Sequence, residues 1–214
     1  MSTLTIAAGN PVLADRVFSR KLATDVVLVA AGAALVSLAA QLTIPLPLVP
    51  ITGQTLAVLV VGATLGASRG AVALGLYALL GLVGLPVYAP QDDGSHLTGL
   101  AALAAPSFGY IIGFILSAAL TGWLAQRQWD RKILGGIAAF VAGTLATFLI
   151  GVPWLAIWLG AHGFDNGFTA VFMSGIFPFL IPGAIKAVVG AGIIRLIWAG
   201  VKRADARATH PDAD

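Results

Sequence analysis

Lys186 is the charged residue that lies deepest inside an apolar stretch of this sequence. Placing a charged side chain at the centre of a membrane-spanning helix costs about 2.5–3.5 kcal/mol, so such a residue usually has a function. A lysine near a helix end can instead extend its apolar stem to the membrane surface. Because Lys186 is far from the basic cluster that begins at Lys202, we predict a functional role for it, with extension to the surface as the alternative.

The acidic residues sharpen this prediction. All nine are aspartates, and none lies in the middle of an apolar segment. A buried ammonium group must be paired or deprotonated. Either Asp165 or the pair Asp92 and Asp93 folds in from outside the membrane, or a bound ligand supplies the missing charge. We predict a ligand that carries a carboxylate or a strongly polar carbonyl.

Other kinds of chemistry lack the residues they need. None of the four lysines follows a glycine, so the chain has no P-loop for ATP. No G-x-S-x-G or H-E-x-x-H motif supports an enzyme, and no cysteine is present. His96, His162 and His210 are too far apart in the sequence for metal-ligand spacing. We expect no enzyme activity, metal or cofactor. Since no acid lies inside a segment to couple ions, the energy for active uptake would come from another protein.

The composition is that of an integral membrane protein. Of the 214 residues, 58% are hydrophobic and 10% are charged, whereas soluble domains carry about 25% charged residues. A helix needs about 20 apolar residues to cross a bilayer. We predict an all-α bundle of six transmembrane helices that forms a single domain, residues 1–214. The six segments are roughly residues 24–41, 51–66, 70–86, 108–125, 133–159 and 168–199.

The basic residues indicate how these segments are oriented. Ten of the twelve lysines and arginines lie before the first segment, after the last one, or in the links that follow the second and fourth. The three other links contain none. By the positive-inside rule both termini are cytoplasmic, as short solvated tails at residues 1–20 and 203–214. This explains the pI of 9.6 without a nucleic-acid partner. A cleaved signal peptide within residues 1–40 is an alternative, although it lacks a convincing cleavage site.

Two links without basic residues are candidates for the walls or lid of a binding site. The first, residues 42–53, contains Pro45, Pro47 and Pro50, and proline lacks the N–H donor that a simple helix needs. Irregular backbone at membrane depth is tolerated where it is buried in protein or lines a cavity. We predict a re-entrant or irregular link that lines a cavity, with an external turn as the alternative. The longest link, residues 87–107, is either a lid or a cap over helix ends.

Small residues at intervals of four allow membrane helices to pack closely. Gly62, Gly66 and Gly70 have this spacing, and so do Gly109 and Gly113. We predict close helix contacts at these positions.

Four stretches together resemble the biotin-binding S components (BioY family) of energy-coupling-factor (ECF) transporters. The resemblance covers roughly residues 20–200, and the combination is more specific than any single stretch. It implies a six-helix bundle with a ligand cavity near the extracellular side, covered by the first external link and the long link at residues 87–107. The stretches are Val49-Pro-Ile-Thr-Gly-Gln-Thr55, Gly81-Leu-Val-Gly-Leu-Pro-Val-Tyr-Ala89, Pro106-Ser-Phe-Gly-Tyr-Ile-Ile-Gly-Phe114 and Pro178-Phe-Leu-Ile-Pro-Gly-Ala-Ile-Lys186.

The resemblance also implies partners and residue roles. In this family a lysine of the last helix helps to bind the ligand, and Lys186 matches it. Small residues of the first helix dock on a transmembrane coupling protein that two ABC-type ATPases drive, and Ala30 and Ala34 are the matching pair. Gly183 stands where the family usually has an aspartate, and Phe108 where a glycine is common. The resemblance therefore does not specify the polar contacts at these positions.

Biotin suits these residues for chemical reasons as well. It has an apolar ring and chain, a ureido group and a carboxylate, and small-ligand pockets combine apolar walls with a few polar groups. We predict that it contacts Lys186, Thr52, Gln54, Tyr88 and Tyr110. The alternatives are structural: Gln54 would satisfy irregular backbone before the second segment, and either tyrosine would anchor the membrane interface.

The expected function is high-affinity capture of biotin by the multi-pass membrane subunit of an ATP-driven importer, in a bacterial plasma membrane. An S component for a different vitamin and a stand-alone membrane facilitator are the alternatives.

Overall fold

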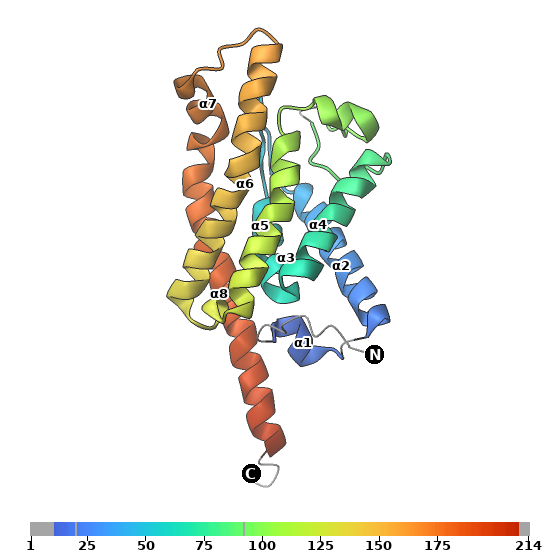
Figure 1. Cartoon of the computed structure of the whole chain (residues 1–214), viewed down its shortest axis with the longest axis vertical. Helices are drawn as coiled ribbons and strands as arrows, with labels where there is room; N and C mark the ends of the chain where they lie inside the picture. Colours follow the sequence, from blue (N-terminus) through green and yellow to red (C-terminus); the bar gives the residue numbers. More distant parts are fainter. Residues whose placement is uncertain (1–10, 20, 92, 210–214) are drawn as a thin grey trace, which may run out of the picture.

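The computed structural model describes residues 11–19, 21–91 and 93–209. Within these ranges the chain forms eight α-helices in an elongated bundle (Figure 1). The outermost parts of both predicted tails, together with Asp92 and His210, lie outside the described residues. The helices are α1 (Leu13–Val17), α2 (Leu22–Ala40), α3 (Gln54–Leu65), α4 (Ala67–Leu82), α5 (Phe108–Gln126), α6 (Ile133–Ala161), α7 (Phe168–Gly175) and α8 (Phe177–Thr209).

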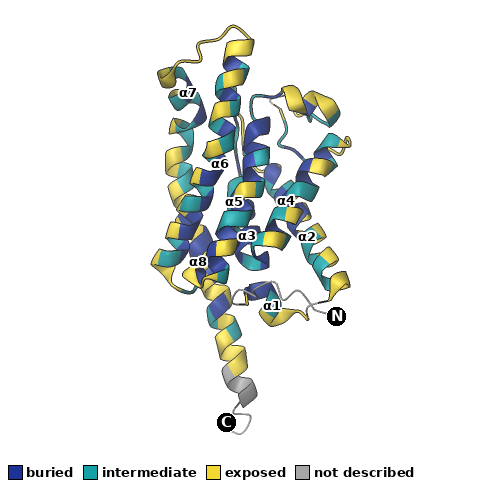
Figure 2. Ribbon diagram, in the orientation of Figure 1, coloured by how far each residue is buried: buried dark blue, intermediate teal, exposed yellow. Residues whose placement is uncertain are grey.

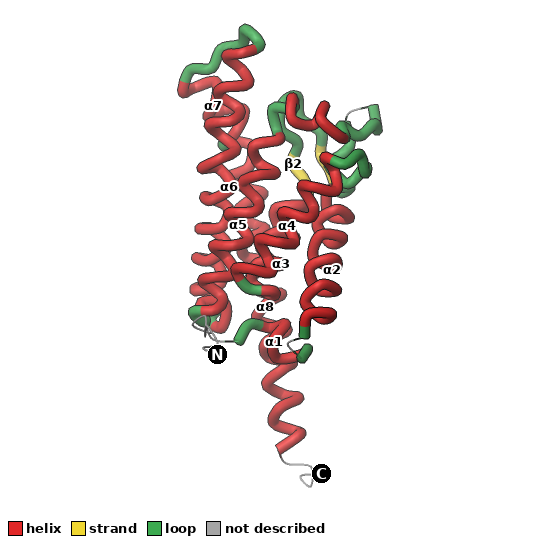
Figure 3. The backbone as a smooth tube through the Cα atoms, turned by 45° about the vertical axis from the view of Figure 1, so that its right-hand side comes forward, coloured by secondary structure: helices red, strands yellow, loops and turns green. Residues whose placement is uncertain are grey.

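The links contain four further elements. Strands β1 (Thr43–Ile44) and β2 (Ile51–Thr52) pair antiparallel, with Thr43 opposite Thr52. The 3-10 helices η1 (Gly99–Ala104) and η2 (Trp129–Arg131) precede α5 and α6. Figures 1 and 3 show β2 and η1 toward one end of the bundle, and α1 with the end of α8 at the other. We call these the hairpin end and the α1 end.

Four parts of the described chain are long and apolar enough to cross a membrane: α2, α5, α6 and Phe168–Asp205, which contains α7 and most of α8. The helices α3 and α4 are apolar but have 12 and 16 residues, fewer than the roughly 20 of a full span. Three of the predicted segments match long helices closely: 24–41 matches α2, 108–125 matches α5, and 133–159 matches α6. Helix length alone does not establish the predicted count of six.

The sixth predicted segment, residues 168–199, is two helices rather than one. The first ends at Gly175, and Ile176 has φ −124° and ψ −54°, away from the regular helical values. Pro178 lacks an N–H, and in a continuous helix its ring would clash with the carbonyl four residues earlier. The chain therefore breaks before α8, which tolerates Pro178 in its first turn.

The second predicted segment is shorter than expected, and the third is shifted, because α4 both begins and ends before predicted residues 70–86 do. Residues 51 and 52 belong to the hairpin, so α3 begins only at Gln54. The three prolines lie between the two strands, and the link is irregular as predicted. Gly66 separates α3 from α4 with φ +86°, a backbone conformation that glycine adopts at little cost.

The central helix of the bundle is α5. In its apolar window 67% of the residues are buried, compared with 17% for α2, and it packs against α3, α4 and α6. Figure 2 shows exposed positions mainly on the outer faces of the bundle and along the lower part of α8. A Cβ on Gly62 would lie 2.6 Å from the Ala118 oxygen, and one on Gly113 would lie 2.5 Å from the Thr147 oxygen. The predicted close contacts at these two glycines are confirmed.

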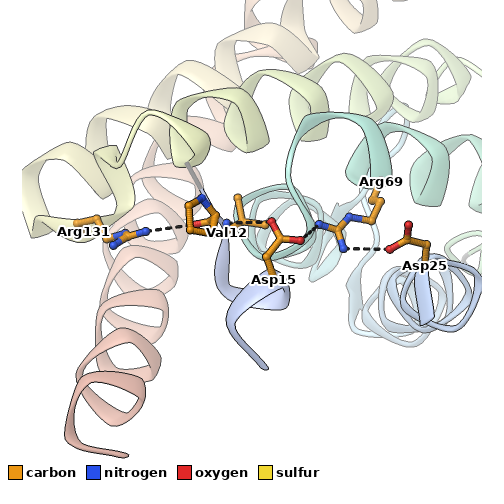
Figure 4. A network of polar contacts seen from close by, with 6 residues as sticks. Val12, Asp15, Asp25, Arg69 and Arg131 are labelled. Atoms are coloured by element: carbon orange, nitrogen blue, oxygen red, sulfur yellow. Dashed lines mark hydrogen bonds and ion pairs between the residues drawn. The ribbon is translucent and has the colours of Figure 1, made fainter. Parts of the chain in front are cut away.

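The N-terminal segment packs against the α1 end of the bundle, which corrects the predicted solvated tail. Residues 12–14 are apolar and buried. Arg69 of α4 pairs with Asp15 of α1 and, at 3.1 Å, with Asp25 of α2. Figure 4 shows its guanidinium between the two carboxylates. α1 packs against α3, and the two ion pairs of Arg69 link α1 and α2 to α4.

The described part of the predicted C-terminal tail is helical, and residues 203–205 are exposed. Helix α8 continues to Thr209 and extends beyond the bundle (Figure 1). Residues 203–209 are rich in alanine and arginine, which have high helix propensity, so the helix does not end at the last apolar residue.

We expect Gly113→Ala to destabilise the protein by about 1–3 kcal/mol, because its Cβ would overlap backbone atoms of α6. The matched control is Gly75→Ala in α4, where a Cβ meets nothing within 4 Å. It should be neutral, or stabilising by up to about 1 kcal/mol. Thermal unfolding of the two purified variants in detergent compares them. Equal unfolding temperatures would contradict the packing described for α5.

Candidate ligand-binding site

A hollow lies toward the hairpin end of the molecule, between the hairpin, residues 88–107 and helices α5, α6 and α8. We call it the hairpin hollow. It contains about 880 Å³ of empty space, counting the solvent at its mouth. All five residues predicted to contact a ligand line it. They are Thr52, Gln54, Tyr88, Tyr110 and Lys186.

Lys186 enters the hollow from α8. Its side chain is partly buried, and its Nζ donates a hydrogen bond to the backbone oxygen of Thr52 at 2.6 Å. In a helix that carbonyl would accept from the amide four residues later, but the hairpin leaves it available to the lysine. None of the described residues that line the hollow is acidic. The ammonium group therefore meets a carbonyl dipole there and no carboxylate.

A chain of buried hydrogen bonds lies beside this contact. The Thr52 hydroxyl donates to Gln54 Oε1 at 2.8 Å, and Gln54 Nε2 donates to the hydroxyl of Tyr77. The side-chain amide of Gln54 has two N–H donors, so one remains to serve a ligand. The orientation of Gln54 is thus set by Thr52 on one side and by Tyr77 of α4 on the other.

Sequence reasoning missed Tyr77. It is fully buried and does not line the hollow itself. The signal that could have found it is a lone hydroxyl in an otherwise apolar stretch, because a buried tyrosine usually needs a hydrogen-bond partner.

Tyr88 holds the long link, residues 87–107, against α4. Its hydroxyl donates to the Ala78 oxygen at 2.6 Å, and its ring meets that of Tyr77 edge-on at 5.5 Å. A Cβ on Gly81 would overlap the Tyr88 ring. Burial raises the pKa of Tyr88 to about 12, so the hydroxyl stays protonated and remains a donor. What Tyr88 presents to the hollow is its ring.

Tyr110 has a similar arrangement on α5. Its hydroxyl donates to the Gly175 oxygen at 2.9 Å, which ties α5 to the end of α7. Its ring packs near Phe148 and Phe179, with centroids 6.3 and 6.2 Å away. Both phenylalanines line the hollow, and sequence reasoning did not single them out. Tyr88 and Tyr110 are both buried, so neither is an anchor at the membrane interface.

Both predicted links contribute to the hollow. Val49 and Pro50 of the first link line it, so this link forms a cavity wall as predicted. The backbone oxygens of Ala105 and Ala104, in the longer link, accept hydrogen bonds from Trp154 and Trp158 of α6 at 3.0 and 2.6 Å. The longest link is therefore tied to α6 where it borders the hollow.

Gly183 also lines the hollow, one turn of α8 before Lys186. A Cβ at this position would meet its nearest neighbour, the Thr144 methyl carbon, at 3.9 Å. The glycine that replaces the aspartate of the resembled family therefore leaves open space and no charge beside the lysine. Phe108 lies elsewhere, with its ring 5.7 Å from that of Trp154.

These features define what the hollow can hold. One cation and one amide donor lie close to Thr52, and the other walls are largely aliphatic or aromatic. Such a site suits a small solute with an apolar body and one anionic or strongly polar end.

The predicted partner-docking residues lie outside this site. Ala30 and Ala34 are both exposed on α2. Gly32, on the buried side of the same helix, faces Ala73 of α4, and a Cβ on it would lie 3.1 Å from the Ala73 methyl carbon. Helix α2 therefore packs on α4 through Gly32 and presents Ala30 and Ala34 on its exposed side.

Comparison with known proteins agrees with this architecture. The protein is 35% identical to the biotin transporter BioY of Rhizobium etli over 86% of this chain and 98% of that protein. It is 34% identical to the biotin transporter BioY of Thermotoga maritima over 74% of this chain and 86% of that one. A crystal structure of the S component for biotin from an ECF-type ABC transporter has the same fold, with a TM-score of 0.70, 22% identity, and coverage of 85% of this chain and 94% of that chain. The BioY family profile matches residues 8–203, and this chain therefore belongs to the BioY family.

Proposed function

We propose that this chain is the biotin-capturing membrane subunit of an ATP-driven ECF-type importer and binds biotin in the hairpin hollow. The observation that carries this proposal is the partly buried Lys186 in a largely apolar and aromatic hollow whose described lining has no acid. Family membership and the Rhizobium etli relative named as a biotin transporter support the choice of biotin.

The polar end of biotin would meet Lys186 and Gln54. The ammonium group has three donors, and its bond to Thr52 uses one of them. A carboxylate or the ureido carbonyl would accept from the others and offset the cost of burying the charge. The apolar ring and chain would pack against Tyr110, Phe148 and Phe179.

The topology proposed with this function has six membrane segments. The two shorter apolar helices, α3 and α4, would complete the bundle that the four long segments begin. Basic residues gather at the α1 end, where Arg69 and Arg131 lie with both terminal segments. By the positive-inside rule this end faces the cytoplasm of a bacterial plasma membrane, and the hairpin hollow opens toward the other side.

The energy for uptake would come from partners. The chain has no P-loop, so ATP hydrolysis is assigned to two ABC-type ATPases acting through a transmembrane coupling protein. The exposed Ala30 and Ala34 on α2 are the proposed docking face, since small residues allow a partner helix to approach closely.

We expect Lys186→Met to weaken biotin binding about 10- to 150-fold, the range for losing a hydrogen bond to a charged group. Calorimetric titration of the purified chain measures it. Lys202→Met is the matched control, because this lysine lies on the same helix but is exposed and outside the hairpin hollow. Unchanged affinity in Lys186→Met would refute the proposed contact.

A panel of biotin, biotin amide and 2-iminobiotin identifies the end of the ligand that meets Lys186, because each analogue alters one polar group. Tighter binding of a different vitamin would favour an S component of other specificity. Transport in vesicles without the partners would favour a stand-alone facilitator.

We propose that the Tyr110 ring contacts biotin, whereas its hydroxyl only bonds the Gly175 oxygen. Tyr110→Phe should change biotin affinity by no more than about twofold, because the hydroxyl is committed to Gly175. Tyr110→Ala should weaken binding about tenfold through lost apolar contact. The same titration measures both variants, and a large loss in Tyr110→Phe would mean that the hydroxyl contacts the ligand.

Substitution of the α2 face should separate capture from transport. Ala30→Trp and Ala34→Trp should leave biotin affinity unchanged and reduce co-purification with the coupling protein and ATPases about tenfold by steric conflict. Ala138→Trp, on an exposed position of α6, is the control. Full complex formation by both α2 variants would show that the partner docks elsewhere.

A further inference from the structure

A second hollow lies toward the α1 end of the molecule, between η2 and α8. It contains about 930 Å³ of empty space, counting open solvent. We call it the basic hollow, because its described lining includes three cationic side chains and no acidic one. It is lined by Arg131, Gly192, Arg195, Leu196, Trp198, Ala199 and Lys202.

The two arginines of this hollow are held in place by the backbone and by an aromatic ring. Arg131 NH2 donates to the Pro11 oxygen at 2.9 Å, and its guanidinium lies 3.7 Å from the centre of the Trp198 ring. Arg195 NH1 donates to the Arg131 oxygen at 3.2 Å. Each guanidinium has five N–H donors, so these contacts leave several for an anion.

The acidic residue next to Arg131 in the sequence, Asp130, contacts Trp198. Asp130 is buried, and its Oδ2 accepts a hydrogen bond from the Trp198 indole at 2.6 Å. Burial raises the pKa of the Asp130 carboxyl, while the Trp198 hydrogen bond and the charge of Arg131 act in the opposite direction. Trp198, which holds this carboxylate, is also the residue whose ring packs on the Arg131 guanidinium. Asp130 does not line the basic hollow.

Apolar and cationic residues alternate where α8 lines the hollow. Gly192, Leu196 and Ala199 recur at intervals of three or four residues, Arg195 lies directly before Leu196, and Lys202 follows Ala199 toward the α1 end. Leu196 is 74% exposed, and a Cβ on Gly192 would meet nothing within 4 Å. An apolar groove on α8 thus lies beside a cluster of three cations.

We propose that the basic hollow binds an anionic phospholipid, with its phosphate at Arg131, Arg195 and Lys202 and an acyl chain along Gly192 and Leu196. Basic pockets between transmembrane helices on the cytoplasmic side bind anionic headgroups. The apolar groove favours a lipid over a free phosphate ion, which would leave the Gly192–Leu196 surface unused. This proposal does not depend on the identity of the transported solute.

The test is a titration of the full-length purified chain in neutral detergent with dioleoyl phosphatidylglycerol, with dioleoyl phosphatidylcholine as the neutral lipid. Native mass spectrometry counts bound lipid. Phosphatidylglycerol should bind preferentially. Arg195→Gln and Lys202→Gln should each weaken it about fivefold, since a cation near an anionic headgroup contributes about that factor.

A charge-neutral variant tests the groove itself. Gly192→Leu fills the hollow without removing a cation and should weaken phosphatidylglycerol about tenfold or more. Gly200→Leu is matched to it, because its Cβ also meets nothing within 4 Å and it does not line the hollow. Lys132→Gln, an exposed cation outside the hollow, is the charge control. Both controls should stay within about twofold.

Three results would overturn the proposal. Equal binding of the two lipids would remove the headgroup preference, and unchanged binding in both Gly192→Leu and Arg195→Gln would remove the site. Displacement of phosphatidylglycerol by millimolar inorganic phosphate would make it a site for a soluble anion. Biotin titration of each variant checks that the bundle has folded, because the proposed biotin site is the hairpin hollow toward the other end of the bundle.

Discussion

The contact between Lys186 and the Thr52 carbonyl is the constraint on which the hairpin end depends. A cation inside an apolar bundle needs partners, and a continuous helix offers none because its carbonyls are already bonded. The prolines of the first external link keep that backbone out of a helix, and the hairpin turns a free carbonyl toward α8. The irregular link and the lysine therefore depend on one another.

Polarity in this end of the molecule is concentrated around one residue. Thr52 accepts from Lys186 through its carbonyl and donates to Gln54 through its hydroxyl, and Gln54 in turn contacts Tyr77. The hydroxyls of Tyr88 and Tyr110 donate to backbone carbonyls, and these hydrogen bonds join one element of the fold to another. The walls of the hairpin hollow can therefore be apolar while its polar contacts stay together.

The proposed activities occupy separate surfaces, which lets each be altered alone. The hairpin hollow lies toward one end of the bundle, the basic hollow toward the other, and the small residues of α2 on an outer face. The central helix α5 packs closely through glycines against its neighbours. Capture of a solute, contact with lipid and docking of a partner would then act on one body without competing for the same residues.

The sequence by itself determined the membrane class and the positions of α2, α5 and α6, and it singled out Lys186 as a candidate. Hydropathy, charge and proline content are local properties that need no knowledge of neighbours. Only the tertiary structure decided that the last segment breaks at Ile176, that residues 12–14 pack under the bundle, and that Tyr77 orients Gln54. These features depend on contacts between residues far apart in the chain, and the partners of a buried polar group cannot be read from its own spacing.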